Sequence, residues 1–171
     1  MALEKLKADL QAAIKTPLHS VEFGEDFGLL VDASISAVGC CLIQWTEDGI
    51  EKPVSFASLK LSPTQSRWST IEREAFAVTW ALKKYRSWIF WAKVKVFSGH
   101  NASTFSTEAA PKSSKLARRA LALQEYNREF SYRAGRRNAA ADYLSRLNCI
   151  NAILNVTGCG QSNKVSYQLV G

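Results

Sequence analysis

The sequence predicts a mixed α/β domain with a five-stranded sheet flanked by helices. Apolar runs of strand length occur at 27–32, 37–45 and 52–61, separated by turn residues, and a long helical pattern follows them. Two further apolar runs, at 93–97 and 128–133, alternate with helical patterns. The chain has 171 residues, 47% of them hydrophobic, which suffices for one domain with its own core and is short for two.

The front of the chain predicts one helix and an antiparallel meander. Leucine and isoleucine recur at helical spacing over 3–16, and Pro17 ends that pattern. The stretch TEDG at 46–49 places glycine where a hairpin turn tolerates positive φ, so the second and third strands should form a hairpin. We therefore expect the first three strands to be antiparallel neighbours.

The rest of the chain predicts helices that alternate with the last two strands. Ser69 or Thr70 can cap a long helix that runs to about Trp88, with Glu72 and Glu74 in its first turns. Further helices are expected at 100–109 (short and weak), 113–127 and 138–147. Without the weak helix, the element order is β-β-β-α-β-α-β-α. Residues 148–171 are richer in Asn, Gly and Ser and are expected to form a loosely ordered tail.

Composition limits the function classes. No apolar run approaches a membrane span, and charges interrupt the N-terminal pattern that a signal peptide would need, so we expect an intracellular protein, cytoplasmic or nuclear, without membrane contact. The four cysteines include no CxxC pair, which argues against a zinc site or a disulfide framework. A net charge of +7 suits a polyanionic partner, and equally a merely basic surface.

Three carboxylates stand where a strand or helix can direct them inward. Asp32 ends an apolar strand, although Asp-Ala-Ser is also ordinary turn chemistry. Glu74 falls on the apolar stripe of the long helix and Glu72 on the opposite side, so Glu74 is either a ligand or a rim residue that reaches water or an arginine. Asp142 lies in the first turns of the last helix, where the helix dipole alone would favour it. The stripe comprises Ile71, Ala75, Val78, Leu82, Tyr85 and Ile89.

Such a set of acids suits divalent cations of the hard type, which prefer oxygen ligands. Two such ions a few ångströms apart can activate water and stabilise the leaving oxygen in phosphodiester cleavage. A basic chain with an acidic metal site is therefore the pattern of a nuclease.

Three segments carry a family resemblance: VDASISAVGCCLIQ, KPVSFASLKLSPTQSRWSTIEREAFAVTWALKKYRSWI and KLARRALALQEYNREFSYRAGRRNAAADYLSRL. They resemble the ribonuclease H domain of Ty3/gypsy-type LTR retrotransposon polyproteins, over roughly residues 22–147. The resemblance implies the ribonuclease H-like fold and an endonuclease that hydrolyses the RNA strand of RNA–DNA hybrids with Mg²⁺ (or Mn²⁺). It also implies that residues 1–21 are the end of the connection to the reverse transcriptase domain of the parent polyprotein.

The resemblance assigns catalytic, metal-binding roles to the same three acids. Asp32 matches the first of four family acids, Glu74 the second and Asp142 the fourth. The third acid should follow the fourth strand, in a pattern like Thr/Ser-Asp-His.

The third position holds no acid in this sequence, which reads Ser98-Gly99-His100. Gly99 cannot ligate a metal through a side chain. Imidazole suits softer metals and Asn lacks the charge, so neither His100 nor Asn101 replaces it. We therefore expect weak metal binding and impaired cleavage.

Other departures from the family are polar residues where apolar ones are usual. Arg119 stands where Trp is common, Arg128 projects from the apolar side of its strand, and Ser103 and Ser106 lie in the weak helix. Each costs roughly 1–3 kcal/mol if it is buried without a partner. Together with Gly99 they indicate relaxed constraint, in a decaying copy or in one kept for something other than cutting.

Three functions remain open. The first is a Mg²⁺-dependent ribonuclease H, active or formerly active. The second is a non-catalytic nucleic-acid-binding or tethering domain, and the third is a protein–protein adaptor that uses the helix at 3–16. For the second, candidate phosphate contacts are Lys83, Lys84, Arg133, Arg136 and Arg137, which otherwise form a solvated basic face. Trp68, Trp88 and Trp91 could stack on bases, or pack at the rim of the core.

Overall fold

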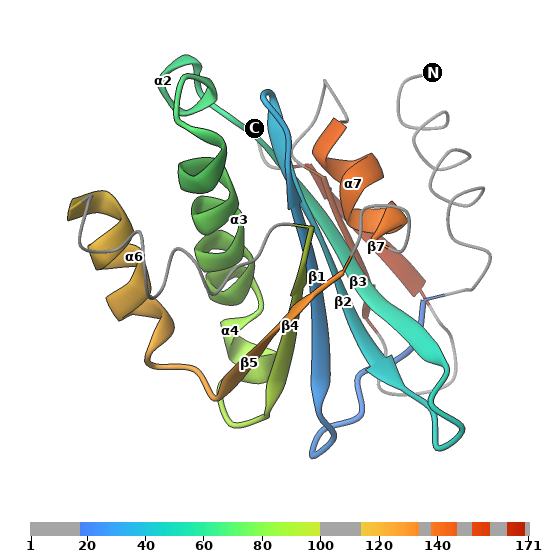
Figure 1. Ribbon diagram of the computed structural model, residues 1–171. Coiled ribbons are helices and arrows are strands. Elements are labelled where there is room, and N and C mark those ends of the chain that lie inside the picture. Colours follow the sequence, from blue (N-terminus) through green and yellow to red (C-terminus); the bar gives the residue numbers. More distant parts are fainter. Residues whose placement is uncertain (1–17, 100–113, 134–137, 147–151, 158–163, 170–171) are drawn as a thin grey trace.

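The computed structural model describes residues 18–99, 114–133, 138–146, 152–157 and 164–169, the last two ranges by their backbone alone. The helices expected at 3–16 and 100–109 therefore lie outside the described residues. The elements are β1 (Phe27–Ala33), β2 (Ala37–Trp45), β3 (Glu51–Lys60), α2 (Pro63–Ser66), α3 (Thr70–Lys84), α4 (Arg86–Ile89), β4 (Val94–Ser98), α6 (Ser114–Leu123), β5 (Arg128–Tyr132), α7 (Ala139–Arg146), β6 (Ala152–Thr157) and β7 (Lys164–Leu169) (Figure 1).

All five predicted strands are present in one mixed sheet. Its order is β5-β4-β1-β2-β3-β6-β7, with β1, β2 and β3 antiparallel and β1, β4 and β5 parallel. As the TEDG stretch predicts, β2 and β3 form a hairpin, and Gly49 has φ +76°. The parallel pairing places the ends of β1 and β4 at the same edge of the sheet.

Two further strands extend the sheet where the sequence predicts a loosely ordered tail. β6 pairs antiparallel with β3, and β7 pairs antiparallel with β6. The Asn, Gly and Ser content of 148–171 favours a loop, but the two short segments AILNVT and KVSYQL within it contain β-branched residues, which favour strands. The open edge of β3 supplies the backbone partner that lets β6 form.

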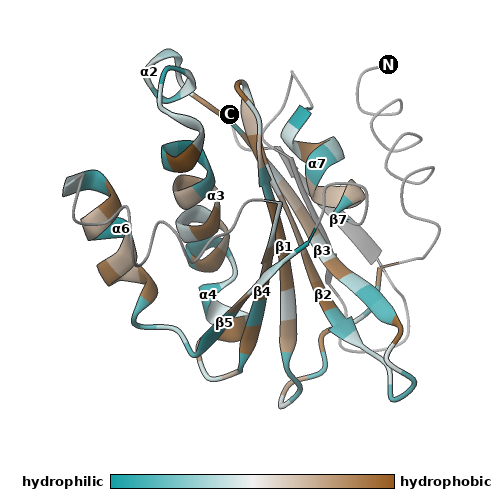
Figure 2. Cartoon of the chain, viewed as in Figure 1, coloured by the Kyte–Doolittle hydropathy of each residue, from teal (hydrophilic) through white to brown (hydrophobic). Residues whose placement is uncertain are grey.

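Helices cover the two faces of the sheet unequally. α3, α4 and α6 lie on one face and α7 on the other (Figure 1), and hydrophobic residues run along β1, β2 and β4 between these layers (Figure 2). Successive strand residues alternate between the faces, so Leu29 and Val31 join the cluster under α3 while Leu30 joins a smaller cluster under α7.

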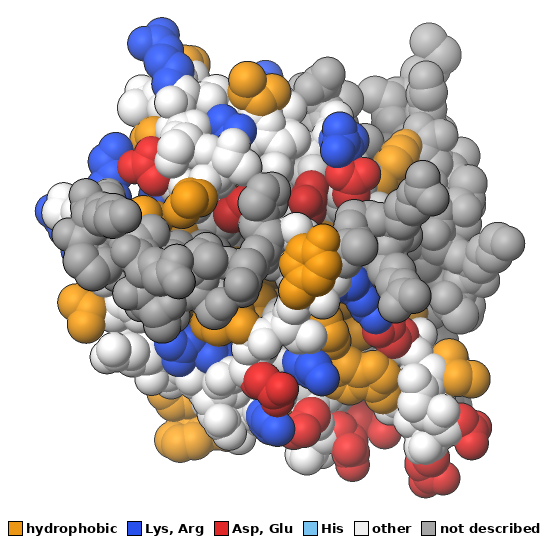
Figure 3. Space-filling view, viewed as in Figure 1, with side chains coloured by type: hydrophobic (Ala, Val, Ile, Leu, Met, Phe, Trp, Pro, Cys, Tyr) orange, Lys and Arg blue, Asp and Glu red, His pale blue; other side chains and the backbone are white. Residues whose placement is uncertain are grey.

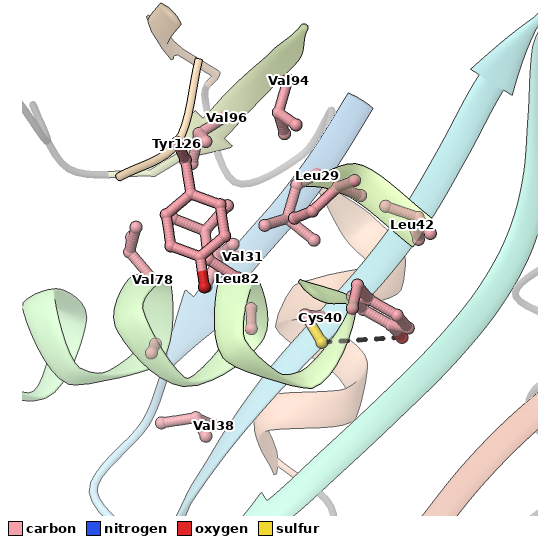
Figure 4. Close-up of a cluster of buried hydrophobic side chains, with 14 of the residues drawn as sticks. Leu29, Val31, Val38, Cys40, Leu42, Val78, Leu82, Val94, Val96 and Tyr126 are labelled. Atoms are coloured by element: carbon pink, nitrogen blue, oxygen red, sulfur yellow. Dashed lines mark hydrogen bonds between the residues drawn. The ribbon is translucent and has the colours of Figure 1, made fainter. Parts of the chain in front are cut away.

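The larger cluster is the main core. It unites strand residues with side chains of α3 such as Val78 and Leu82 (Figure 4). Ile89 of α4 and Leu123 of α6 belong to the same cluster. The thiol of Cys40 lies 3.9 Å from the Tyr85 hydroxyl in this core. Cys40 and Cys41 are buried and free.

The long helix begins as predicted and ends early. Ser69 caps α3 and exchanges hydrogen bonds with Glu72 in a capping box. The predicted run to Trp88 is interrupted at Tyr85, after which α4 follows. The stripe is buried except Ile71, which is 41% exposed because the buried part of α3 starts only at Glu74. Among the described helices, none is long and apolar enough to cross a membrane.

Candidate active site

The ends of β1 and β4 bring Asp32 and Gly99 together. Val31 pairs with Ser98 in the parallel register, so the next residue of each strand lies at the same edge. Among the described residues, a Cβ built on Gly99 would lie nearest to Asp32 Oδ1, at 3.8 Å, and to the Arg133 carbonyl, at 3.9 Å. These are ordinary van der Waals distances, so the described residues leave room for a Cβ at this position beside Asp32.

Glu74 reaches this edge from α3. Its side chain is 1% exposed, and the Ser98 hydroxyl lies 3.5 Å from Oε2, a long hydrogen bond. Burial, and then the negative charge of Asp32, raise the pKa of Glu74 to about 8. The inward position that the helical spacing predicts for Glu74 is thus confirmed, and its carboxyl is electrostatically coupled to Asp32.

Asp142, which matches the fourth acid of the family pattern, lies on α7 and forms an ion pair with Arg146. Arg146 donates to Asp142 Oδ1 from Nε at 2.8 Å, and Nη2 lies 2.7 Å from the same oxygen. The side chain of Asp142 is 35% exposed. α7 also contacts Asp32 directly, because the Ser145 hydroxyl donates to Asp32 Oδ2 at 2.6 Å.

The donors are of the right chemistry for a hard cation, yet the set is incomplete. Within the described ranges, no three acidic, histidine or cysteine side chains are grouped so that they could hold a metal ion. Asp32 and Glu74 interact, whereas Asp142 is engaged by Arg146. The described residues therefore do not by themselves provide the two-cation site that the resemblance implies.

The three predicted phosphate contacts that the structure describes are not gathered at this edge. Lys83 and Lys84 end α3, about 15 Å along the helix axis from Glu74. Arg133 forms an ion pair with Glu51 and stacks 4.6 Å from the Phe97 ring centroid, so only its backbone borders Gly99. The remaining two candidates, Arg136 and Arg137, lie outside the described residues.

Of the two arginines among these departures, Arg119 is well partnered, whereas the buried Nε of Arg128 makes no hydrogen bond among the described residues. Arg119 lies 4.6 Å from the Trp68 ring and 5.4 Å from the Phe76 ring, and donates to the Glu72 carbonyl at 2.6 Å. Arg128 lies 5.5 Å from the Phe130 ring. The penalty expected for an unpartnered arginine therefore does not apply to Arg119. Ser103 and Ser106 lie outside the described residues.

Two of the three tryptophans pack rather than present a free ring. Trp68 meets Phe76 edge to face at 5.6 Å, and Trp88 stacks on Tyr85 at 5.8 Å. Trp91 is 94% exposed, in the turn before β4. That turn lies at the opposite end of β4 from Gly99, so Trp91 is remote from the carboxylates.

Sequence reasoning missed the residues of α7 that bind these acids. Ser145 and Arg146 follow Asp142 by three and four positions, the spacing at which helical side chains meet. That spacing could have indicated the Arg146–Asp142 pair. The contact of Ser145 with Asp32 depends on how α7 packs on the sheet, and no local signal predicts it.

Residues 22–126, more than half of the chain, match the family model of the RNase H-like domain found in reverse transcriptase. In Drosophila melanogaster, the retrovirus-related Pol polyprotein from transposon opus is 35% identical over 126 residues, which is 73% of this chain and 12% of that polyprotein. The corresponding polyprotein from transposon gypsy is 30% identical over 154 residues, 90% of this chain and 14% of that polyprotein. The chain thus spans about an eighth of these relatives.

Solved structures share the fold. The foamy viral protease-reverse transcriptase in complex with RNA/DNA hybrid superposes with a TM-score of 0.55 at 16% identity, over 68% of this chain and 16% of that one. LC11-RNase H1, isolated from compost, superposes with a TM-score of 0.53 at 17% identity, over 70% of this chain and 92% of that one.

The class that these observations define is the ribonuclease H-like α/β fold. The chain belongs to the family of RNase H-like domains found in reverse transcriptase, and its relatives are Ty3/gypsy-type transposon polyproteins.

Proposed function

We propose that this chain is the ribonuclease H domain of a retroelement polyprotein whose Mg²⁺-dependent cleavage of RNA in RNA–DNA hybrids is disabled by Gly99. One observation carries the proposal. The Cβ position of Gly99 faces Asp32 Oδ1 at 3.8 Å, where the third acid of the family pattern would stand. Asp32, Glu74 and Asp142 are the remaining catalytic and metal-binding acids under this proposal.

The family resemblance implies the reaction, and the glycine at position 99 supports its impairment. The solved polymerase that shares this fold is in complex with an RNA/DNA hybrid, which supports the same substrate class here. A hard cation bound by carboxylates loses affinity when one charged ligand is missing. If both cations are required, loss of one raises the barrier by several kcal/mol, which corresponds to about two or more orders of magnitude in rate.

The domain boundaries and partners follow from the same proposal. Residues 22–147 are the ribonuclease H-like unit and 1–21 join it to the reverse transcriptase domain of the parent polyprotein. β6 and β7, which follow this unit, cover the edge of β3. The intracellular location in cytoplasm or nucleus and the nucleic-acid contacts at Lys83, Lys84, Arg133, Arg136 and Arg137 remain part of this proposal.

The test is cleavage of a labelled RNA–DNA hybrid with Mg²⁺ or Mn²⁺ by the parent chain, Gly99→Asp and Gly99→Asn. The asparagine variant is the matched control, because it has the shape of aspartate without the charge. We expect cutting by Gly99→Asp alone, at least about a hundredfold above the parent.

Two results would contradict the proposal. Cutting by the parent at the rate of Gly99→Asp would show that Gly99 is not the lesion. If no variant cuts, the remaining acids do not form a working site. Salt-dependent binding to hybrid without cutting by any variant would then favour the non-catalytic binding or tethering function, and absence of binding would favour the adaptor.

A further inference from the structure

Basic side chains gather around Trp68, where α6 packs against the beginning of α3. Lys115 Nζ lies 5.3 Å from the centroid of the Trp68 ring, and the Arg119 guanidinium lies 4.6 Å from it. Arg73 donates from Nη1 to the Trp68 carbonyl at 2.8 Å. Two exposed arginines adjoin these groups, one directly before Trp68 and one a helical turn after Lys115. The five cations form a basic platform, which comprises Arg67, Arg73, Lys115, Arg118 and Arg119. In the space-filling view, Lys and Arg side chains are visible over α2 and α6 at the upper left (Figure 3).

The positive charge of this platform is only partly compensated. Glu72 pairs with Lys115 at 3.8 Å, and the Glu72 carbonyl accepts a hydrogen bond from Arg119 at 2.6 Å. No described residue forms an ion pair with Arg67 or Arg118. Cations that lie close together repel one another, so the platform carries an electrostatic cost that a bound polyanion would relieve.

A simpler role for these cations is to attach α6 to α3. A cation over an aromatic face stabilises such a contact, and this accounts for Lys115 and Arg119, which both lie against Trp68. It does not account for Arg67 and Arg118, because their side chains are exposed and form no ion pair within the described ranges. These two arginines are the feature that points to a partner.

The platform lies at the same end of α3 as the buried carboxylate. Lys115 and Arg119 both contact Glu72, which precedes Glu74 by two residues, or about 3 Å along the helix axis. The lysines that the sequence predicts as phosphate contacts lie at the other end of this helix. A polyanion bound to the platform would therefore lie near the carboxylate edge.

We propose that the basic platform binds the phosphate backbone of nucleic acid beside the carboxylate edge. The inference rests on the proposed function, which supplies the RNA–DNA hybrid as partner, and it assigns the contact to basic residues other than those predicted from the sequence. Guanidinium and ammonium groups are the usual partners of phosphate oxygens. Trp68 packs edge to face on Phe76, so its ring positions the cations and does not stack on bases.

The test is binding of the full chain to a fluorescently labelled RNA–DNA hybrid without divalent cations, measured by anisotropy at several salt concentrations. Arg67→Gln and Arg118→Gln each remove one exposed charge of the platform. We expect each to weaken binding roughly fivefold to tenfold at about 0.1 M salt, and to reduce the dependence of log K on log salt by about one, as for one lost phosphate contact. Arg118→Lys keeps the charge and should bind nearly as well as the parent.

Lys52→Gln is the matched control, because it loses the same charge at a distant place. Lys52 lies near the start of β3, at the opposite end of the sheet from Asp32, and lines a pocket with Glu22 and Glu47. Exposed charges more than about 10 Å apart are largely screened at this salt concentration. The control should therefore change the affinity less than about twofold.

Weaker binding by both platform variants, with an unchanged control, supports the proposal. Equal weakening in Lys52→Gln would show an effect of net charge alone. Unchanged binding in Arg67→Gln and Arg118→Gln would show that the platform only attaches α6 to α3, and absence of binding by the parent would also overturn the proposal. Because this assay contains no divalent cation, its result is independent of whether Gly99→Asp restores cutting.

Discussion

The two faces of the sheet place their acids in opposite environments. On the α3 face, Glu74 is 1% exposed and its pKa is raised to about 8 by burial and the charge of Asp32. On the α7 face, Asp142 is 35% exposed and paired with Arg146. The space-filling view shows carboxylates and basic side chains close together on this molecule, with acidic groups gathered at its lower end (Figure 3).

The difference shows two ways in which negative charge is accommodated at one edge of the sheet. A buried carboxylate avoids the free-energy cost of a desolvated charge by taking up a proton. An exposed carboxylate can instead form an ion pair with an arginine. Protonation therefore relieves the burial of Glu74, whereas Asp142 is stabilised by its ion pair with Arg146. The two faces also differ in hydrophobic packing, because the core under α3 is larger than the cluster under α7.

The largest expected effect tests whether the core under α3 contributes more to stability than the cluster under α7. Leu82→Ala on α3, a fully buried position, should lower the free energy of unfolding by about 3–5 kcal/mol. Leu144→Ala on α7 should cost about 2–3 kcal/mol, because fewer side chains surround it and a cavity there can collapse more easily. Urea denaturation followed by circular dichroism measures both values.

The control is Leu121→Ala, whose side chain is 63% exposed, and it should change stability by less than about 0.5 kcal/mol. If Leu144→Ala proves the more costly of the two buried changes, the α7 face is the main core and the comparison is reversed.

Much of this organisation follows from the sequence, and the exceptions have physical causes. The succession of strands and helices along the chain and the inward position of Glu74 depend on local periodicity, which a single sequence displays. β6 depends on the open edge of β3, and Arg119 is accommodated by two aromatic rings on other elements. Such tertiary partners leave no local signal, so the tail was expected to be loosely ordered and Arg119 to be costly.

The residues of the candidate site also divide into those that the sequence could identify and those that it could not. Asp32, Glu74 and the missing acid at Gly99 could be located from motif positions, and the register of β1 and β4 puts two of them side by side. Ser98 and Ser145 carry no signature on their own, and their contacts with Glu74 and Asp32 arise only after β4 and α7 have been placed.

The second prediction uses the raised pKa of Glu74. In the unfolded chain this carboxyl should titrate near its ordinary value of 4.5, and in the folded chain at about 8. Between these values the folded state binds more protons, so this residue lowers stability as pH rises from about 4.5 to 8. Below about pH 4.5 Glu74 does not lower the free energy of unfolding, and above about pH 8 the full cost of its ionisation is present.

Glu74→Gln should remove this pH dependence. Relative to the parent, the variant should gain stability between pH 5 and pH 8.5, by up to about 4 kcal/mol. Urea denaturation at several pH values, without divalent cations, measures the difference. Glu72→Gln is the control, because Glu72 lies on the same helix, outside the acid cluster, and pairs with Lys115. A parent and a Glu74→Gln variant with parallel pH profiles would show that Glu74 is ionised at little cost.

The smallest expected effect concerns how closely α7 approaches the sheet. Gly39 pairs with Asp32 across β1 and β2, and a Cβ there would lie 2.5 Å from both the Ala141 carbonyl and the Ser145 nitrogen. These are backbone atoms of α7, so the helix itself must move. Gly39→Ala should cost about 1–3 kcal/mol of stability and weaken the bond between Ser145 and Asp32.

Gly28→Ala is the matched control within the same sheet. Its Cβ would meet Cγ1 of the buried Ile43 at 2.5 Å and the ends of the Ile43 and Trp45 side chains at 2.8 Å, so this change also requires a shift, but of side chains within the sheet and not of the α7 backbone. A gain in strand propensity of about 0.5–1 kcal/mol should offset part of that cost. Hydrogen exchange of the α7 amides should rise in Gly39→Ala and not in Gly28→Ala, because only the former separates α7 from β2. Equal protection of α7 in both variants would show that the helix accommodates a methyl group, and that the close approach at Gly39 does not position Ser145 against Asp32.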